Sequence, residues 1–302
     1  MSSLTHEFQH KLPVTKERLF AALTEPQALR RWFAEYVEIQ PRPGGTLRFW
    51  GKHTYGTPQR EQASQQLLRY EPPHALAYTW TLHDRPSEVT LLVDADPELT
   101  NGSILKGRHE FAQAPAIGRA KEMIDDLWRL QIGNLQMYLE GGQGILLPDY
   151  SDPNPRIRVA IMIDAPRENV FRALIQPELL NKWIAAAAEV DPRVGGHYRL
   201  GWKHQHNGVS FDGGPTRILD MVENEKLVID WPDWRGDTSV PQQKITWLLE
   251  SIGRQTRVTL IHDDFTRTVD LSDYPFGWSF FLDCLKRVAE GKEVPAHEHN
   301  CG

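Results

Sequence analysis

The chain repeats the stretch Glu189-Val190-Asp191-Pro192-Arg193-Val194-Gly195-Gly196-His197-Tyr198-Arg199-Leu200. An earlier copy lies 151 positions before it and keeps the same residues at Glu38, Pro41, Arg42, Gly44, Gly45 and Arg48. The segment before that copy repeats at the same offset, with identical residues at Phe20, Ala22, Leu23, Pro26, Leu29 and Trp32. Because no gap interrupts this correspondence, we interpret the chain as two copies of one module.

Length and composition agree with two globular domains. The 302 residues allow two domains of the usual size of about 100–200 residues. The net charge of -6 and the lack of a basic block argue against binding to nucleic acid or anionic membranes. No secretory signal and no membrane-spanning apolar run are visible. Cys284 and Cys301 have no local partners, so we expect a reducing, cytoplasmic location.

Both copies show the same order of predicted elements. Alternating polarity over 4–12 and 157–163 predicts a first strand, in which His10 corresponds to Ile161. Two short helices follow, and Thr15, Pro166, Pro26 and Pro177 mark their starts. Short strands joined by turns then predict an antiparallel meander. The strands are expected at 46–50, 66–70, 75–80, 89–93 and 105–111, and at 197–202, 216–222, 226–231, 244–250 and 256–262.

Each copy ends with an amphipathic helix. Its apolar face carries Ile124, Leu127, Trp128, Ile132, Leu135 and Leu139 in copy one, and Trp278, Phe281, Leu282, Leu285 and Val288 in copy two. Glycines stop both helices. A strand, two helices, a sheet and a last helix predict a sheet that curls around that helix. We therefore expect domains at 1–145 and 156–292, a stiff proline-rich linker at 146–155 and a disordered tail at 293–302.

These motifs resemble a known family. The pattern Phe-x-Ala-Leu-x-x-Pro-x-x-Leu-x-x-Trp, followed by Pro-Arg-x-Gly-Gly, occurs in both copies. Later strands end in Trp80 or Trp231 and in His109 or His262, and the last helix ends in Glu-Gly. Together they resemble the domains named after the activator of the Hsp90 ATPase, in the START-like or Bet v 1-like helix-grip superfamily. The resemblance covers nearly the whole chain, but copy one departs from it after Gly51, where Leu99 to Ser103 and Ala112 to Arg119 fit the pattern poorly.

The resemblance implies an α+β fold of two tandem helix-grip domains. Such domains typically hold a hydrophobic molecule between the sheet and the last helix, and some are cyclases or dehydratases. The co-chaperone itself carries a further amino-terminal domain with a Trp-rich motif that we do not find, so we expect no stimulation of Hsp90. Because copy one departs from the pattern, we expect the better-formed cavity in copy two.

The candidate cavity residues are aromatic side chains and histidines on the predicted strands and last helices. They are Trp50, Trp80, His109, Trp128, Trp202, Trp231, Trp247, His262 and Trp278. Each indole could instead be packed core, and His109 and His262 could be structural side chains at strand ends. His10 could be a half-exposed strand residue or a polar cavity group.

A metal site has weaker support. His204 and His206 share a strand face, but zinc needs three or four ligands and no others are placed by spacing. We expect no metal and no cofactor.

Three functions remain open at this point. The first is non-catalytic binding of a small hydrophobic or amphipathic molecule, because no nucleophile, base and orienting group can be assembled. For this function we expect a monomer. The second is a cyclase-, dehydratase- or hydrolase-like enzyme that uses His109, His262 or the His204 and His206 pair. The third is a protein-interaction module of the co-chaperone kind, with an exposed apolar patch.

Overall fold

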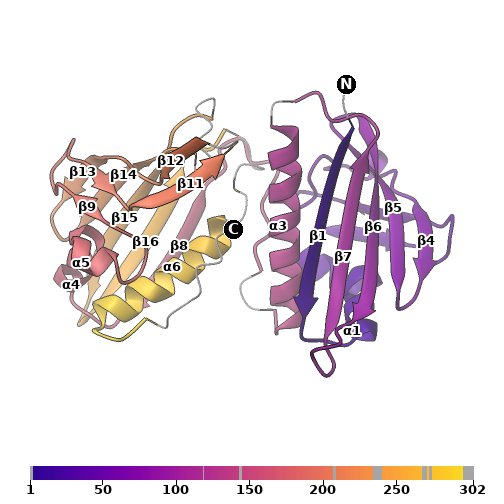
Figure 1. Ribbon diagram of the computed structural model, residues 1–302, viewed down its shortest axis with the longest axis horizontal. Coiled ribbons are helices and arrows are strands. Elements are labelled where there is room, and N and C mark those ends of the chain that lie inside the picture. Colours follow the sequence, from indigo (N-terminus) through magenta and orange to yellow (C-terminus); the bar gives the residue numbers. More distant parts are fainter. Residues whose placement is uncertain are drawn as a thin grey trace. The chain divides into compact units, whose positions relative to one another are not determined.

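The computed structural model describes residues 3–117, 119–142, 145–206, 209–233, 240–266, 271 and 274–294. The chain forms two compact units, which we call domain 1 and domain 2. The boundary between them along the sequence lies between Pro153 and Asn154. Each is described by itself. Figure 1 shows in each domain a sheet accompanied by a long last helix, so the chain is α+β as the repeat predicted.

Domain 1 is built on one five-stranded antiparallel sheet. Its elements are β1 (Leu4–Leu12), α1 (Lys16–Thr24), α2 (Pro26–Trp32), β2 (Tyr36–Ile39), β3 (Leu47–Trp50), the 3-10 helix η1 (Arg60–Gln62), β4 (Leu67–Glu71), β5 (Ala75–Leu82), β6 (Arg85–Ala95), β7 (Ser103–Phe111) and α3 (Ala120–Leu139). The sheet order is β1-β7-β6-β5-β4, and β2 pairs with β3 in a separate hairpin.

Domain 2 has the same sheet. Its elements are β8 (Ile157–Ile163), α4 (Arg167–Ile175), α5 (Pro177–Leu180), β9 (Glu189–Val190), β10 (Tyr198–Arg199), β11 (Trp202–His206), β12 (Val209–Gly213), β13 (Ile218–Val222), β14 (Lys226–Trp231), β15 (Gln243–Ile252), β16 (Gln255–Asp263) and α6 (Tyr274–Ala289). The order β13-β14-β15-β16-β8, read from its other end, matches that of domain 1. The chain therefore has two tandem helix-grip domains.

The tryptophan of the repeated motif fastens the second short helix to the first. Trp32 Nε1 donates to the carbonyl of Ala22 at 3.0 Å, and Trp183 Nε1 donates to that of Ala173 at 2.9 Å. Both indoles are buried. A buried indole N–H needs an acceptor, and a carbonyl of the preceding helix supplies it. The motif thus specifies how the two short helices pack.

The two glycines of the Pro-Arg-x-Gly-Gly motif are each required for a different structural reason. Gly44 and Gly195 have positive φ values of 72° and 79°. A Cβ on Gly45 would lie 2.2 Å from the carbonyl oxygen of Gln40, so the backbone comes too close for any side chain. The Gly44 amide donates to the carbonyl of Leu67. This turn therefore ties the β2–β3 hairpin to β4 and is not arranged to hold a phosphate.

Segments of equal length fold differently in the two domains. The bridges Thr46 to Gln66 and His197 to Arg217 mark matching positions 151 residues apart. Between them, residues 51–65 of domain 1 form turns and η1, whereas domain 2 has the hairpin β11–β12. The single strand predicted at 197–202 is wrong in detail, because the chain divides there into β10 and β11 at Gly201, whose φ is 72°. The two domains therefore differ in structure directly after β3 and β10.

The start of the predicted linker packs on domain 1. The side-chain amide of Asn134 donates to the carbonyl of Leu146 and accepts from its N–H, at 2.7 and 2.8 Å. The Tyr150 amide donates to the carbonyl of Lys52 at 2.8 Å. These bonds hold the first half of the segment 146–155 to the domain, so this half is an ordered strap. Among the described helices, none is long and apolar enough to cross a membrane.

Candidate ligand-binding site

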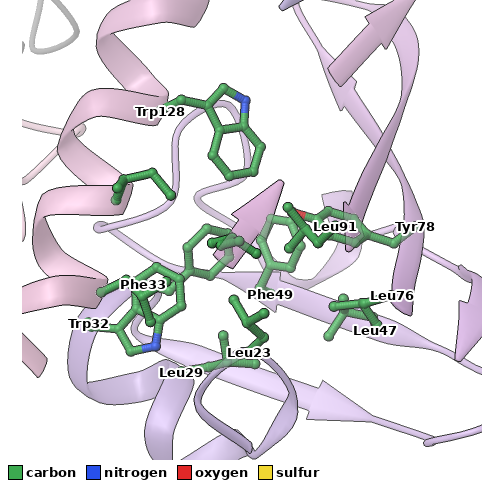
Figure 2. A pocket seen from close by; sticks show the side chains of 13 residues that line it. Leu23, Leu29, Trp32, Phe33, Leu47, Phe49, Leu76, Tyr78, Leu91 and Trp128 are labelled. Carbon is green, nitrogen blue, oxygen red and sulfur yellow. The ribbon is translucent and has the colours of Figure 1, made fainter. Parts of the chain in front are cut away.

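Domain 1 encloses an apolar cavity of about 30 Å³ between α3 and its sheet. The lining side chains are Leu23, Leu29, Trp32, Phe33, Leu47, Phe49, Leu76, Tyr78, Leu91, Leu105, Trp128, Ile132 and Leu135. Figure 2 shows the indole of Trp128, from α3, at one end of the group, with the rings of Phe33 and Phe49 beside the aliphatic walls. This is the place where the helix-grip fold predicts a ligand.

The cavity is small in this conformation. A volume of about 30 Å³ has room for roughly two water molecules, and its apolar walls offer water almost no hydrogen bonds. Pockets that enclose drug-sized molecules measure about 300–1,000 Å³. The space therefore admits only a very small molecule unless its walls move apart. It lies in domain 1, so the expectation of a better-formed cavity in copy two has no support from it.

In domain 2, indole rings pack in the same layer between α6 and the sheet. The ring of Trp247 lies 6.0 Å from that of Trp183 and 6.0 Å from that of Trp278, with both pairs almost perpendicular. The ring of Trp202 stacks on that of Phe281 at 6.2 Å. Edge-to-face contacts at these distances are typical of a filled aromatic core. The predicted cavity residues of domain 2 thus pack mainly against one another.

His109, on β7, has both ring nitrogens in hydrogen bonds. Trp128 Nε1 donates to its Nδ1 at 3.1 Å, and its Nε2 lies 2.8 Å from Ser87 Oγ. An indole N–H can only donate, so Nδ1 is the acceptor and Nε2 carries the proton. Ser87 then accepts from the ring and donates to the carbonyl of Trp80 at 2.6 Å. The imidazole is a neutral link between α3 and the sheet.

His262, on β16, repeats this arrangement with another partner. Trp278 Nε1 donates to its Nδ1 at 3.0 Å, and its Nε2 donates to Gln243 Oε1 at 2.9 Å. Gln243 and Ser87 occupy the same register position, because each lies opposite the last tryptophan of the preceding strand, Trp231 or Trp80. Histidine and tryptophan therefore form one repeated pair.

Burial keeps both imidazoles uncharged. Burial, with a smaller contribution from the neighbouring His6, lowers the pKa of His109 to about 3. Burial also lowers the pKa of His262 well below its ordinary value. Near neutral pH neither ring takes up a second proton and becomes charged. Neither ring has a free nitrogen for proton transfer. The arrangement favours the structural interpretation of both histidines over an acid–base role.

The predicted tryptophans fall in several environments. Trp128 lines the cavity, whereas Trp80 is buried beside it and stacks on His109 at 5.7 Å. Trp50 is not a cavity wall, because it alternates with the cavity residue Phe49 and so points to the outer face of β3. There its ring stacks on the exposed Tyr36 at 5.5 Å.

Sequence reasoning missed the aliphatic and phenyl walls of the cavity. Leu23, Leu29 and Ile132 lie on the inward faces of helices, and Phe49 and Leu91 lie at inward strand positions. Their periodicity marks them as core, but it does not distinguish a residue beside a void from one in full contact. His10 also belongs to the helix-facing row of β1, where its Nε2 bonds to Gln136 Oε1 of α3 at 3.1 Å.

No metal site emerges from the part of the chain that the structure describes, which contains no group of three or more His, Cys, Asp or Glu side chains suited to a metal ion. The backbone places His204 and His206 in β11. Their side chains, and the terminal tail with Cys301, lie outside the described residues.

Several solved structures are similar to this chain. CalU16 from Micromonospora echinospora is 25% identical over 47% of this chain and 69% of its own, with a TM-score of 0.38. DynU16, described as a putative protein in the dynemicin biosynthetic locus, is 14% identical over 94% of this chain and 98% of its own, with a TM-score of 0.39. The Aha1 dimer from Colwellia psychrerythraea is 24% identical over 45% and 96%, with a TM-score of 0.36.

No curated protein matches the chain. The family model of the activator of Hsp90 ATPase homolog 1-like proteins matches it twice, over residues 13–140 and 164–290. Each match falls within one domain and includes its two short helices, its Pro-Arg-x-Gly-Gly turn and its last helix. The chain therefore belongs to the family of activator of Hsp90 ATPase homolog 1-like proteins, as a tandem pair of helix-grip domains.

Proposed function

We propose that the protein binds a small hydrophobic or amphipathic molecule between the sheet and the last helix of a domain, without catalysing a reaction on it. The helix-grip fold generally binds hydrophobic ligands. The observation that carries the proposal for this chain is the apolar cavity between α3 and the sheet of domain 1. Enclosed apolar space at the ligand position of a fold is the usual starting point for a binding site.

The state of the histidines supports binding without catalysis. A general acid or base needs a proton that it can exchange near neutral pH and a free position toward the substrate. His109 and His262 use both ring nitrogens within the protein, and burial lowers both pKa values. An enzyme that used either imidazole would first have to break these bonds.

We infer that a ligand larger than the cavity displaces the wall formed by the β2–β3 hairpin, which breaks the bonds between the Gly44–Gly45 turn and Leu67. Phe49 belongs to the β2–β3 hairpin, which pairs with itself and joins the main sheet near β4. That junction includes the Thr46 to Gln66 bridge and the bonds between Gln65 and the Phe49 backbone, at 3.4 and 3.2 Å. Moving the hairpin outward leaves the five-stranded sheet intact. The proposal therefore places entry between this hairpin and α3.

Native mass spectrometry of the purified protein tests the proposal directly, followed by thermal unfolding with a panel of lipids, polyketides and aromatic acids. A retained organic molecule, or a compound that stabilises the folded state, is the expected result. A ligand at 100 times its Kd adds about 2.7 kcal/mol to the free energy of unfolding.

Two matched variants show where the ligand binds. Ile132→Trp narrows the cavity and should remove the stabilisation, whereas Arg60→Ala, on the surface beside Trp50, should keep it. A protein that carries nothing and is stabilised by no compound would refute the proposal. Turnover of a compound without stoichiometric binding would favour an enzyme instead.

A further inference from the structure

Strand register equates Leu91 of domain 1 with Trp247 of domain 2. Leu91, on β6, lies opposite Leu76 on β5, and Trp247, on β15, lies opposite Leu227 on β14. Leu76 and Leu227 are 151 positions apart, the offset of the repeat. The two domains therefore carry a leucine and a tryptophan at one and the same place in the sheet.

Two tryptophans beside this position are present in both domains. In domain 1, Leu91 lines the cavity together with Trp32 and Trp128. Their counterparts in domain 2 are Trp183, in the repeated motif, and Trp278, which bonds to the equivalent histidine. The indole of Trp247 makes perpendicular contacts with both of these rings. It thus fills the layer in which domain 1 has its cavity.

At other wall positions the larger side chain is in domain 1. Domain 1 has Phe33, Phe49 and Tyr78 where domain 2 has Ile184, Leu200 and Ile229. The larger side chains of domain 1 take up part of the space that a missing indole would leave, yet a cavity of about 30 Å³ remains. Leu91 and Trp247 are thus a wall position at which domain 1 has the smaller side chain and domain 2 the larger.

We propose that Trp247 is a built-in plug, so that domain 1 alone receives the ligand, and that the residue at this position decides whether a domain admits one. This inference rests on the proposed function. The shape of the plug also indicates the ligand class. In domain 2 an indole packs between the two tryptophans that both domains share. Once the walls of its cavity move apart, the same place in domain 1 suits a small, flat, uncharged aromatic molecule of one or two rings.

Titration of the full-length protein with indole, followed by calorimetry, tests the plug. The wild type should bind one molecule. Trp247→Leu should bind two, because the smaller Ile184, Leu200 and Ile229 leave room once the plug is gone. Leu91→Trp should weaken binding in domain 1 by tenfold or more.

The control variants distinguish the opening of a binding site in domain 2 from a general loss of packing in the protein. Trp50→Leu removes an indole from the outer face of β3 and should leave the stoichiometry at one. Trp247→Phe keeps a ring in place and should also bind one, and circular dichroism reports whether each variant is folded. If Trp247→Leu does not fold, Leu91→Trp still decides, because unchanged indole binding by this variant overturns the proposal.

The two hypotheses fail in different ways. One site in both the wild type and folded Trp247→Leu overturns the plug but leaves the proposed function standing. No site in the wild type but one in Trp247→Leu supports the plug and argues against ligand binding by the natural domain 1. No site in either protein overturns both.

Discussion

Domain 1 and domain 2 keep one sheet order and differ in where their aromatic side chains lie. Trp50 ends β3 and points outward, whereas the tryptophan of domain 2 comes one position later in the repeat, at Trp202. Successive residues of a strand point to opposite faces, so a shift of one residue places the indole on the other face of the hairpin. Trp202 accordingly stacks on Phe281 of α6.

The comparison separates what the fold needs from what it tolerates. The helix-fastening Trp32 and Trp183 and the bonds from Trp128 and Trp278 to their histidines occur in both domains with nearly the same geometry. The cavity wall and the segment after β3 or β10 differ between the two domains. The shared hydrogen bonds hold the last helix and the short helices in place, and the interior between them is free to be hollow or filled.

The largest expected effect comes from breaking the shared pair. His262→Ala leaves the N–H of Trp278 and Gln243 Oε1 without partners in a buried site and opens a void. We expect a loss of about 3–5 kcal/mol from the free energy of unfolding of domain 2. His109→Ala should cost domain 1 about 1 kcal/mol less, because Ser87 keeps its bond to the Trp80 carbonyl.

Differential scanning calorimetry of the full-length variants measures both effects, since each variant should move the transition of its own domain. A His262→Ala protein with unchanged unfolding would show that the hydrogen bonds of the imidazole contribute nothing. Equal losses in the two variants would show that Ser87 gives no compensation.

Acid should destabilise both domains through the same histidines. The pKa of His109 is about 3 in the folded protein and about 6.5 when the chain is unfolded, so between these values only the unfolded chain takes up the proton. The free energy of unfolding therefore falls as the pH drops below about 6.5, by about 2 kcal/mol for this histidine at pH 5. His262 acts in the same direction in domain 2.

Denaturant unfolding between pH 7 and pH 5 measures this dependence, in a range above that in which carboxylates usually titrate. His109→Gln has no titrating ring at this position. It should remove most of the pH dependence of the free energy of unfolding of domain 1 and leave that of domain 2 unchanged. A wild-type stability that stays constant from pH 7 to pH 5 contradicts neutral burial of the rings.

The sequence predicted the features that repeat. The offset of 151 residues, the motif tryptophans and the alternation in the strands were enough for two helix-grip domains and their last helices. These features follow from local patterning and from residues that the turns require.

The cavity could not be located in the same way. Leu91 and Trp247 are both ordinary core residues by periodicity, and only strand register shows that they are equivalent. Whether an inward side chain leaves a void depends on the summed size of its neighbours, which come from distant parts of the chain. Selecting tryptophans alone therefore found Trp128 and missed the walls formed by Leu23, Phe49 and Ile132.

The smallest expected effect concerns the tryptophans of β5 and β14, Trp80 and Trp231. Trp231 Nε1 donates to Tyr274 Oη at 3.2 Å, whereas Trp80 Nε1 is buried without a partner among the described residues. The reason lies in the last helix, where Ile124 takes the place of Tyr274. Replacing Trp80 by Phe removes an unsatisfied donor, whereas the same change at Trp231 removes a hydrogen bond.

Trp231→Phe should therefore cost about 1 kcal/mol more free energy of unfolding than Trp80→Phe. A double-mutant cycle with Tyr274→Phe locates the difference. Once the tyrosine hydroxyl is gone, Trp231→Phe should cost no more than Trp80→Phe, because neither indole then has an acceptor. If the cost of Trp231→Phe stays the same without the hydroxyl, the difference between the domains arises from ring packing, and the Trp231–Tyr274 bond adds no stability to domain 2.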